Sequence, residues 1–547
     1  MSTALKCLRP FLRLQARLLP QAASSAYLRF YSAARSQNEP RIRFGSGILE
    51  RRYISEPYPR IKPEKAAIEC KEFFERYREI HREHTSKEEV IIRGRIWSFR
   101  AAGSKLAFVD LYQDNRKIQC IFNYGKLADT DSSPSRFKGF LGSLHRGNVL
   151  SVKGFPHRTS RNELSIQATE LPQLLSRCSQ FLPEDLKDQE TRMRNRHVDL
   201  LINPWLSDTI RLRAKVIQFL RQYLSDDGHI EVQTPILADT AGGAVARPFT
   251  TTATEFQNRR ISLRIAPELW LKRLVLGGFE KIFEIGPSFR NEGIDLNHNP
   301  EFTTCEFYRT YVELEGLISK TETMFLRLSR VVATMLQYEC RNIPPQEIDF
   351  SPPYRRLDFI PAVEAAVGQQ LPDLTSLVAQ SELLALFNDK GITLPSLPTV
   401  PRLLEKLSST YLEPQCITPT WIINHPECLS PLSKSFIHPD NQQRVAARAE
   451  LFIENQEFVN TYEEENSPEE QRRKFEEQLL YHEGDPDAGV DESYLQALEW
   501  GLPPTGGWGC GIDRLCMLFA GTNRIADVLS FGTLRNVIAL RQSSKRS

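Results

Sequence analysis

FEIGPSFRNEG (residues 283–293) and HNPEFTTCEFY (residues 298–308) are neighbouring segments, and each contains a short apolar run. A charged segment separates the two runs, which predicts two strands joined by a loop. The loop would carry Arg290 and Glu292 at its tip. An arginine placed there can hold a carboxylate or a phosphate through two parallel hydrogen bonds and stabilise negative charge as it develops. Considered alone, the same residues also fit an exposed charged turn.

A second informative segment, GGWGCGIDRLCML, lies far downstream at residues 506–518. Its glycines would allow a ligand to approach the backbone closely. Arg514 begins an apolar helix from which a guanidinium group can cover a purine or reach a phosphate. The Walker pattern and the Rossmann glycine pattern are both missing from the sequence, so neither of these common nucleotide-binding loops explains the segment.

The composition is that of a globular protein, with 547 residues of which 41% are hydrophobic and 25% charged. This length predicts several domains. The net charge is only +2, so contact with a nucleic acid would depend on local basic patches. Charges interrupt every apolar run before the roughly 18 to 20 residues needed to cross a bilayer, and we expect no membrane insertion. The ten cysteines form no C-x-x-C pair and are expected to be reduced and mostly buried.

The N-terminus has the composition of a targeting segment. Residues 1–38 contain no acidic side chain, and their basic side chains are Lys6, Arg9, Arg13, Arg17, Arg29 and Arg35. A positive segment that can form an amphipathic helix is typical of a mitochondrial transit peptide, with a disordered basic tail as the alternative. We predict a transit peptide at residues 1–36 and a location in the mitochondrial matrix.

Four further regions follow along the chain. Residues 37–88 are expected to form an N-terminal extension with an amphipathic helix. Residues 89–178 contain five short strands with polar turns, which favour a small OB-fold β-barrel. Residues 179–204 are charged and turn-rich and are expected to be a linker. Residues 205–540 mix helices with strands, which favours an antiparallel sheet with flanking helices and an α+β fold class.

The segments that contain Arg290 and Arg514 resemble motifs 2 and 3 of the class II aminoacyl-tRNA synthetases. GHIEVQTP (228–235) resembles motif 1, which forms the dimer interface in this class. Further segments are similar to the lysine-specific branch, the class II lysyl-tRNA synthetases: GGAVARPF (242–249), RIAPELWLKRL (264–274), and HP (425–426) followed by SPL (430–432). The resemblance extends over residues 88–535. With the targeting segment, it implies a mitochondrial form with an OB-fold anticodon-binding domain, a class II catalytic domain and a homodimer.

The resemblance also implies the reaction and the ATP site. A member of this branch attaches L-lysine to tRNA(Lys) through a lysyl-adenylate, with ATP as substrate and Mg²⁺ as cofactor. Arg290, Glu292 and Arg514 would be the catalytic residues. Arg290 would hold the lysine carboxylate and the α-phosphate, and Glu292 the adenine amino group. Phe302 and Arg514 would cover the two faces of adenine, and His298 would assist with the phosphates.

The lysine-binding residues implied by the resemblance lie in four separate segments. Glu464 and Tyr308 would recognise the ε-ammonium group, Glu268 and Gly243 the α-amino group, and Asn460 the carboxylate. A buried carboxylate that faces an ammonium gives selectivity, because a substrate without that charge would leave the anion unpaired.

Two further sets of residues match functional positions of the family. Glu450 and Glu457 match the metal-binding positions, and Mg²⁺ requires carboxylate oxygens together with substrate phosphates. Arg100, Phe108 and Gln119 match the residues that hold the centre of the anticodon, by base stacking and edge-specific hydrogen bonds. Phe108 could equally belong to the barrel core.

Three other functions compete with this interpretation. Aspartyl- and asparaginyl-tRNA synthetases usually have QPEFTQ where this chain has HNPEFT (298–303), and an acidic substrate would need a cation in place of Glu464. Paralogues that transfer lysine to a protein lack the barrel. A non-catalytic RNA-binding paralogue is disfavoured because the predicted catalytic and metal-binding residues are all present. The segment after motif 3, FGTLRN (531–536), departs from the family pattern. This departure affects the expected packing of the C-terminus and not the predicted chemistry.

Overall fold

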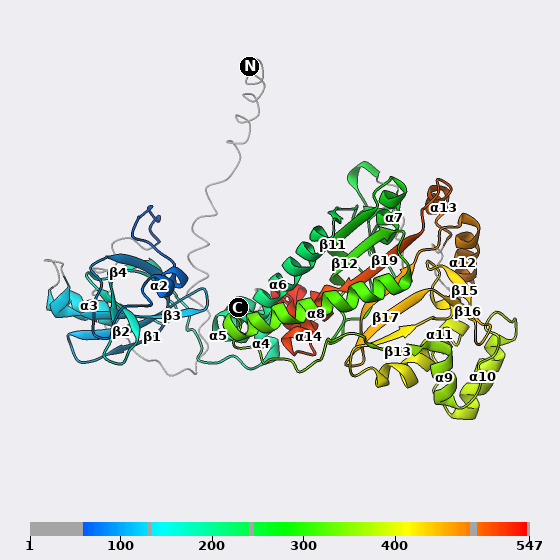
Figure 1. Cartoon of the computed structure of the whole chain (residues 1–547). Coiled ribbons are helices and arrows are strands. Elements are labelled where there is room, and N and C mark those ends of the chain that lie inside the picture. Colours follow the sequence, from blue (N-terminus) through cyan, green and yellow to red (C-terminus); the bar gives the residue numbers. More distant parts are fainter. Residues whose placement is uncertain (1–57, 128–132, 240–245, 257–258, 482–488, 544–547) are drawn as a thin grey trace, which may run out of the picture. The chain divides into compact units, whose positions relative to one another are not determined.

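The computed structural model of the protein describes residues 58–127, 133–239, 246–256, 259–481 and 489–543. The predicted transit peptide at residues 1–36 and the predicted lysine-binding residue Gly243 lie outside these ranges. The chain forms two compact units, which divide between Phe181 and Leu182 (Figure 1).

The first unit is a closed barrel of five strands. The strands pair in the order β1–β2–β3–β5–β4, and the pairing of β4 with β1 closes the ring. β3 and β5 run parallel, and the other neighbours run antiparallel. The strands are β1 (Val90–Ala101), β2 (Leu106–Gln113), β3 (Arg116–Asn123), β4 (Val149–Arg158) and β5 (Leu164–Ala168), and β6 (Gln173–Ser176) pairs with β4.

Apolar side chains that alternate along these strands fill the barrel. Helix α3 (Pro134–Ser143), which connects β3 to β4 after the short η1 (Tyr124–Lys126), contributes Phe137 and Phe140 to this core. The amphipathic helix of the N-terminal extension is α2 (Cys70–Arg76), and its Phe73 is fully buried against the barrel. The strand order and the position of α3 are those of an OB-fold, so the predicted barrel is confirmed.

The second unit is built on an eight-stranded sheet in the order β13–β14–β17–β18–β19–β12–β11–β7. The six central strands are antiparallel, whereas the edge strands β7 and β13 run parallel to their neighbours. The predicted α+β class is confirmed, with one parallel pair at each edge of the sheet. The strands are β7 (Ile230–Glu231), β11 (Lys281–Phe289), β12 (Glu301–Thr310), β13 (Arg355–Asp358), β14 (Thr420–Ile423), β17 (Arg448–Ile453), β18 (Gln456–Glu463) and β19 (Thr505–Gly511).

Three helices cover one face of this sheet: α6 (Pro204–Asp226), α8 (Leu314–Tyr338) and α14 (Ile512–Ala520) (Figure 1). Phe283, Phe307 and Trp508 point from neighbouring strands into the core beneath these helices. The Trp508 indole donates a hydrogen bond of 3.0 Å to Thr321 of α8. Side chains alternate along a strand. The residues that directly precede and follow each of these three in its own strand therefore point to the opposite face of the sheet.

The remaining elements surround the sheet. The helices are α4 (Gln189–Arg194), α5 (Arg196–Ile202), α7 (Glu268–Leu276), α9 (Phe359–Val367), α10 (Ala379–Lys390), α11 (Val400–Leu407), α12 (Pro468–Leu480), α13 (Glu492–Leu498), α15 (Ile525–Val528) and α16 (Leu534–Ser543). Short strands form two small sheets: β8 (Leu237–Ala238), β9 (Thr250–Thr251) and β10 (Ile261–Leu263), and β15 (Ser435–Ile437) with β16 (Arg444–Ala446). Single helical turns are η2 (Thr254–Phe256), η3 (Ser408–Leu412), η4 (Glu413–Gln415) and η5 (Glu427–Leu429).

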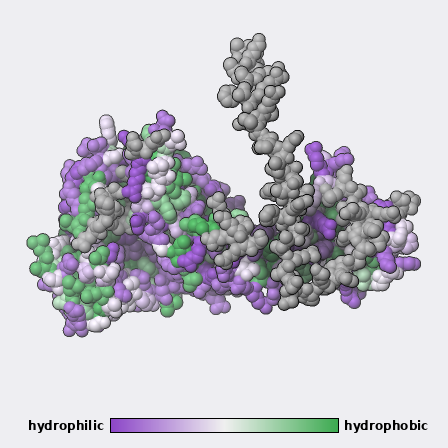
Figure 2. Space-filling view, turned by 180° about the vertical axis from the view of Figure 1, so that it is seen from behind, coloured by the Kyte–Doolittle hydropathy of each residue, from purple (hydrophilic) through white to green (hydrophobic). Residues whose placement is uncertain are grey.

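The surface is mixed in character. Apolar and polar side chains are interspersed on the face shown in Figure 2. Within the part of the chain that the structure describes, no helix combines the length and the apolar composition needed to cross a bilayer.

Candidate active site

A row of polar side chains crosses the sheet on the face opposite α6, α8 and α14. The strand register places Glu284, Glu306, Gly509, Asn460 and Glu450 side by side on β11, β12, β19, β18 and β17. Residues that are opposite each other in a sheet point to the same face. Gly509 has no side chain, so the middle of the row stays open. The sheet therefore brings together two predicted site residues, Asn460 and Glu450, that are ten positions apart in the chain.

Arg290 and Phe302 meet at one end of this face, where β11 and β12 are joined by the loop. The guanidinium carbon of Arg290 lies 5.1 Å from the centroid of the Phe302 ring. The backbone amide of Arg290 donates to the carbonyl of Pro300 at 2.9 Å, which ties the two ends of the loop together. Glu292 is exposed in the same loop. The predicted hairpin thus holds Arg290 against the aromatic ring of Phe302 in a cation–π contact.

Arg514 is linked to the same loop through His298. Nη2 of Arg514 lies 2.9 Å from Nε2 of His298, and Nδ1 of His298 lies 2.8 Å from the carboxylate of Asp295. A guanidinium group only donates, so Nε2 of His298 accepts and its Nδ1 carries the proton that faces Asp295. Arg514 also donates to the backbone carbonyl of Glu457 at 3.0 Å. The first turn of α14 is therefore tied both to the loop and to β18.

Asp513, next to Arg514, fixes this turn from the other side. Its carboxylate accepts a hydrogen bond of 2.8 Å from the backbone amide of Thr303 and forms an ion pair with Arg213 of α6. Arg213 donates in turn to the Thr303 hydroxyl at 3.0 Å. Because Thr303 follows Phe302 directly, this network sets the distance between the ring and Arg514. The sequence gave no local signal for Arg213 or Asp513.

Glu450 and Glu457 lie on adjacent strands beside Arg514. Burial opposes ionisation of Glu450, but the charges of Arg448 and His425 outweigh it and lower its pKa to about 2. The side chain of Glu457 is 39% exposed, yet the surrounding protein and the charge of Glu450 raise its pKa to about 7. Two carboxylates that repel each other in this way fit a divalent cation.

The carboxylate pair would hold such a cation only together with a substrate. Among the described residues, no three His, Cys, Asp or Glu side chains come close enough to form a metal site by themselves. Mg²⁺ is commonly bound by one or two carboxylates, with the other positions filled by water and phosphate oxygens. Glu450 and Glu457 match this donor set.

The predicted lysine-binding residues converge further along the same face. Glu268 begins α7, and Glu464 follows β18; both are buried. The Tyr462 hydroxyl donates to Glu268 at 2.5 Å, and the buried Tyr308 hydroxyl lies 3.4 Å from Glu306. The structure therefore brings Glu268, Tyr308 and Glu464 into one pocket, although they are separated by up to 196 positions in the chain.

A lysine of the chain itself joins the two glutamates of this pocket. Lys272 is fully buried, its Nζ lies 2.7 Å from Oε1 of Glu268, and it also pairs with the carboxylate of Glu464. Burial opposes the charge of Lys272, but the two carboxylates raise its pKa. Burial and the charge of Glu268 raise the pKa of Glu306 to about 8. The pocket thus holds three carboxyl groups around one ammonium, and burial also raises the pKa of Glu464.

Gly507 makes room for the carboxylate of Glu464. A Cβ atom at this position would lie 1.9 Å from Oε1 of Glu464 and 2.9 Å from Cε1 of Tyr308. Any residue with a side chain would therefore displace both groups. The sequence predicts that the glycines of this segment let a ligand approach the backbone. In the structure, Gly507 makes room for the side chain of Glu464.

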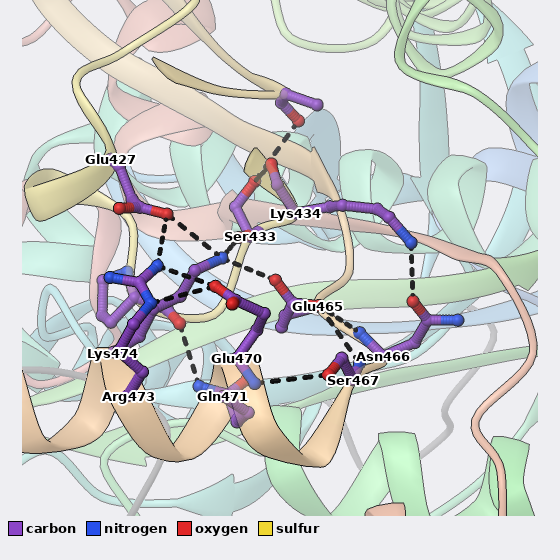
Figure 3. Close-up of polar contacts among 12 residues, drawn as sticks. Glu427, Ser433, Lys434, Glu465, Asn466, Ser467, Glu470, Gln471, Arg473 and Lys474 are labelled. Carbon is purple, nitrogen blue, oxygen red and sulfur yellow. Dashed lines mark hydrogen bonds and ion pairs between the residues drawn. The ribbon is translucent and has the colours of Figure 1, made fainter. Parts of the chain in front are cut away.

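A second buried ion pair lies directly behind Glu464. Oε2 of Glu465 lies 2.6 Å from Nζ of Lys474 on α12. Lys474 also donates to the carbonyl of Ser433 at 2.6 Å, and the backbone amide of Glu465 donates to Leu432 at 2.9 Å. Figure 3 shows Lys474 reaching from its helix to this strand. The pair holds the segment that carries Glu464 in place.

The neighbouring charges on α12 extend this network. Arg473 lies 2.8 Å from Glu427 and 2.9 Å from Glu470 (Figure 3). Arg444 lies 3.0 Å from Glu427. Burial opposes ionisation of Glu427, but hydrogen bonds and the charge of Arg473 lower its pKa. α12 is thereby attached both to η5 and to the strand of Glu464.

Comparison of the sequence with known proteins identifies a family. The chain matches the class II tRNA synthetases (D, K and N) over residues 188–535 and the OB-fold nucleic acid binding domain over residues 90–174. It is 39% identical to the mitochondrial lysine–tRNA ligase of Schizosaccharomyces pombe, with 88% of this chain and 91% of the relative covered. The chain belongs to the lysine–tRNA ligase family of class II tRNA synthetases. The family predicted from the motifs, and with it the enzyme class, is confirmed.

Other relatives of this class II synthetase come from different cellular settings. The mitochondrial lysine–tRNA ligase of Saccharomyces cerevisiae is 36% identical, with 84% of each chain covered. The lysine–tRNA ligase of the bacterium Halalkalibacterium halodurans is 36% identical, with 82% of this chain and 87% of the relative covered. Class II synthetases use ATP as a substrate together with a divalent metal, which agrees with the carboxylate pair of Glu450 and Glu457.

We expect Lys474→Met to impair lysine binding more than ATP binding. Removal of the ammonium leaves Glu465 buried without a partner, which costs about 3–5 kcal/mol for a broken buried pair and loosens the strand of Glu464. The KM for lysine should rise several-fold and the melting temperature should fall, whereas the KM for ATP changes little. Lys434→Met is the matched control, because Lys434 makes an exposed hydrogen bond to Asn466. A folded Lys474→Met variant with the original KM for lysine would contradict this role.

We also expect lysine binding to release a proton from Glu306. Without substrate, its pKa of about 8 keeps this carboxyl largely protonated at neutral pH. A bound ammonium favours the ionised form and lowers that pKa, so the affinity for lysine should increase as the pH rises towards about 8 and then level off. Calorimetry in two buffers of different ionisation enthalpy measures the released proton. The same measurement on Glu306→Gln should show no release from this position, and equal release from both proteins would refute the assignment.

Proposed function

We propose that the protein attaches lysine to tRNA(Lys) in an ATP-dependent reaction that passes through a lysyl-adenylate. The observation that carries this proposal is the buried cluster of Glu268, Glu306 and Glu464, in which Lys272 is the one cation of the described residues that forms an ion pair with these carboxyl groups. Free lysine has two ammonium groups that can pair with these carboxyl groups. An amino acid without the second ammonium would leave a buried carboxylate unpaired, which costs several kcal/mol.

The order of groups along the sheet supports the first chemical step. The lysine pocket lies on one side of the polar row along the strands, and Arg290 with Phe302 lies on the other side. A lysine held by Glu464 and Glu268 would direct its carboxylate towards Asn460 and Arg290. An oxygen of this carboxylate attacks the α-phosphorus of ATP, the bond to the bridging oxygen breaks, and pyrophosphate leaves with the electron pair. This step requires positioning and charge neutralisation more than a general base.

The cations of the site would neutralise the phosphates. Arg290, beside Phe302, would hold the α-phosphate, and Arg514, at the start of α14, would reach the leaving group. Glu450 and Glu457 would hold Mg²⁺, which would offset the charge of the phosphate oxygens. In the second step a terminal ribose hydroxyl of the tRNA attacks the lysyl carbonyl carbon, and AMP leaves. Glu292, exposed in the loop, is free to meet the adenine amino group when ATP enters.

The barrel supports recognition of an anticodon. The guanidinium carbon of Arg100 lies 4.5 Å from the centroid of the Phe108 ring on the outer surface of β1 and β2. Phe108 is only partly buried, and the barrel core is formed by its neighbours Ala107 and Val109. Gln119 is 6% exposed, and its amide donates to Glu163 at 3.1 Å. These three residues offer a stacking surface and a hydrogen-bonding edge for bases.

An exposed apolar edge supports a homodimer formed through motif 1. β7 is the last strand of the large sheet, so its outer edge is unpaired within the described residues. Ile230 on this strand is 52% exposed, and Leu237 on β8 is 54% exposed. A second copy of the chain would cover these side chains and the open edge of the strand.

The mitochondrial matrix is the proposed location. It rests on the acid-free segment 1–36 and on relatives from two yeasts that are named mitochondrial, whereas other relatives are named cytoplasmic or come from bacteria. The enzyme would serve mitochondrial translation.

Lysine-dependent exchange of pyrophosphate into ATP tests the proposed reaction. The wild-type protein should catalyse exchange with lysine but not with aspartate or asparagine. Glu464→Gln should lower kcat/KM for lysine roughly a hundredfold or more, because it removes a buried charge that pairs with the substrate. Glu463→Gln is the matched control, since Glu463 accepts a hydrogen bond from Leu314 and an amide can replace it. Absence of lysine-dependent exchange, or faster exchange with aspartate, would refute the proposal.

Deletion of residues 1–36 tests the proposed location. The shortened protein should retain lysine-dependent exchange but remain in the cytosol, because the positive segment that drives import is gone. Cell fractionation of the full-length and shortened proteins measures this difference. Import of the shortened protein at the original level would contradict the transit peptide.

A further inference from the structure

A second cluster of aromatic and arginine side chains lies on the face of the barrel that carries Phe108. Phe108, Asp110 and Tyr112 alternate along β2 with the fully buried residues Val109 and Leu111. Side chains two positions apart leave a strand on the same face. Tyr112 therefore shares the outer face with Phe108, about 13 Å further along the strand.

Trp97 is placed beside Tyr112 by an irregularity in β1. The register of β1 with β2 shifts between Ile96 and Ser98, so that Trp97 is the additional residue of a bulge. Its ring centroid lies 5.1 Å from that of Tyr112, and the rings are tilted by 38°. The guanidinium carbon of Arg146, just before β4, lies 4.6 Å from the centroid of Trp97. A guanidinium group thus lies over an aromatic ring here, as it does in the pair of Arg100 and Phe108. In that pair the guanidinium carbon lies 4.5 Å from the ring centroid.

The positive charge of this cluster is available to a ligand. Arg95 donates to the carbonyl of Gly147 at 2.7 Å, and Arg146 rests on the Trp97 ring. Neither of these two arginines forms an ion pair with a carboxylate among residues 58–127 and 133–239. Nε of Arg146 is buried and has no hydrogen-bond partner. The cluster thus combines two half-buried aromatic rings with two cations that lack an anion.

The centre of the same face has a different character. Lys117 lies 3.6 Å from Asp110 and 3.9 Å from Glu163, and Gln119 donates to Glu163. One ammonium lies between two carboxylates there, and the groups offer hydrogen bonds suited to the edges of bases. The face therefore has a polar centre, and a guanidinium group lies over an aromatic ring at each end.

We propose that Trp97, Tyr112, Arg95 and Arg146 form a second subsite for single-stranded RNA, which binds a nucleotide of the anticodon loop next to the anticodon. The proposal rests on the proposed binding of tRNA by this face. A base stacks on the Trp97–Tyr112 pair, and the two guanidinium groups contact the adjacent phosphates. Because every base has a flat π-face, this subsite adds affinity without reading sequence, whereas the centre of the face reads base edges.

Binding of two short RNAs tests the subsite. The first is an RNA hairpin whose loop carries a lysine anticodon, and the second is the anticodon trinucleotide alone. With the full-length protein, Trp97→Ala should weaken hairpin binding roughly tenfold, and Trp97→Phe should retain most of the affinity. Arg146→Gln should reduce the slope of log Kd against log salt concentration by about 1. The trinucleotide should bind all variants as it binds the wild type.

The controls separate this subsite from a general defect. Trp500→Ala removes a tryptophan of the second unit that is 88% exposed and should leave hairpin binding unchanged. Hairpin binding that is unaffected by both Trp97→Ala and Arg146→Gln would overturn the subsite. The subsite would also be overturned if these variants lost trinucleotide binding to the same extent as hairpin binding, because that result would show that the barrel itself is distorted. Lysine-dependent pyrophosphate exchange is measured on the same proteins: its absence in the wild type refutes the proposed function, whereas the hairpin titration decides the subsite.

Discussion

The ion pairs of Lys272 with Glu268 and Glu464 are the interaction around which the second unit is organised. A buried carboxylate is stable only when a cation or a set of hydrogen bonds compensates for the water that it has lost. Lys272 and Glu268 are one helical turn apart on α7, whereas Glu464 follows β18. One ammonium therefore holds the helix against the sheet. Because it serves two carboxylates, the pocket contains more carboxyl groups than cations that pair with them among the described residues.

The central strand β19 separates this polar pocket from the apolar core. Gly507 and Gly509 face the pocket, where the first admits the carboxylate of Glu464 and the second keeps the polar row open. Trp508 and Cys510, which alternate with them, are buried beneath the helices on the other face. Large residues on one face and glycines on the other allow a single strand to serve both a packed core and a binding site.

Local patterns in the sequence predicted the elements of the fold, and the motif resemblance predicted the site residues that lie on them. The alternation of apolar residues predicted the barrel, and the two runs on either side of Arg290 predicted the hairpin that brings this residue to Phe302. Lys272 and Glu306 were not predicted, because their roles depend on partners far away in the sequence. Lys272 lies on a helix that reads as ordinary amphipathic sequence, and Glu306 reads as one polar residue in a strand.

The same reason explains the residues that position the site. Arg213 and Asp513 are 300 positions apart, and Glu465 meets Lys474 only because β18 and α12 turn towards each other. Pairings of this kind leave no periodic signal in the sequence, since either residue alone fits an exposed charged surface. The order of strands in the sheet, which determines these pairings, also had to come from the structure.

The contact between His298 and Arg514 has a consequence for how a nucleotide enters. In the free protein the imidazole holds one edge of the guanidinium group, and Asp295 holds the imidazole, so the loop is latched to the start of α14. A phosphate that reaches this edge of Arg514 must take the place of the imidazole. Nucleotide entry would then exchange one partner of the arginine for another and break the contact that ties the loop to the start of α14.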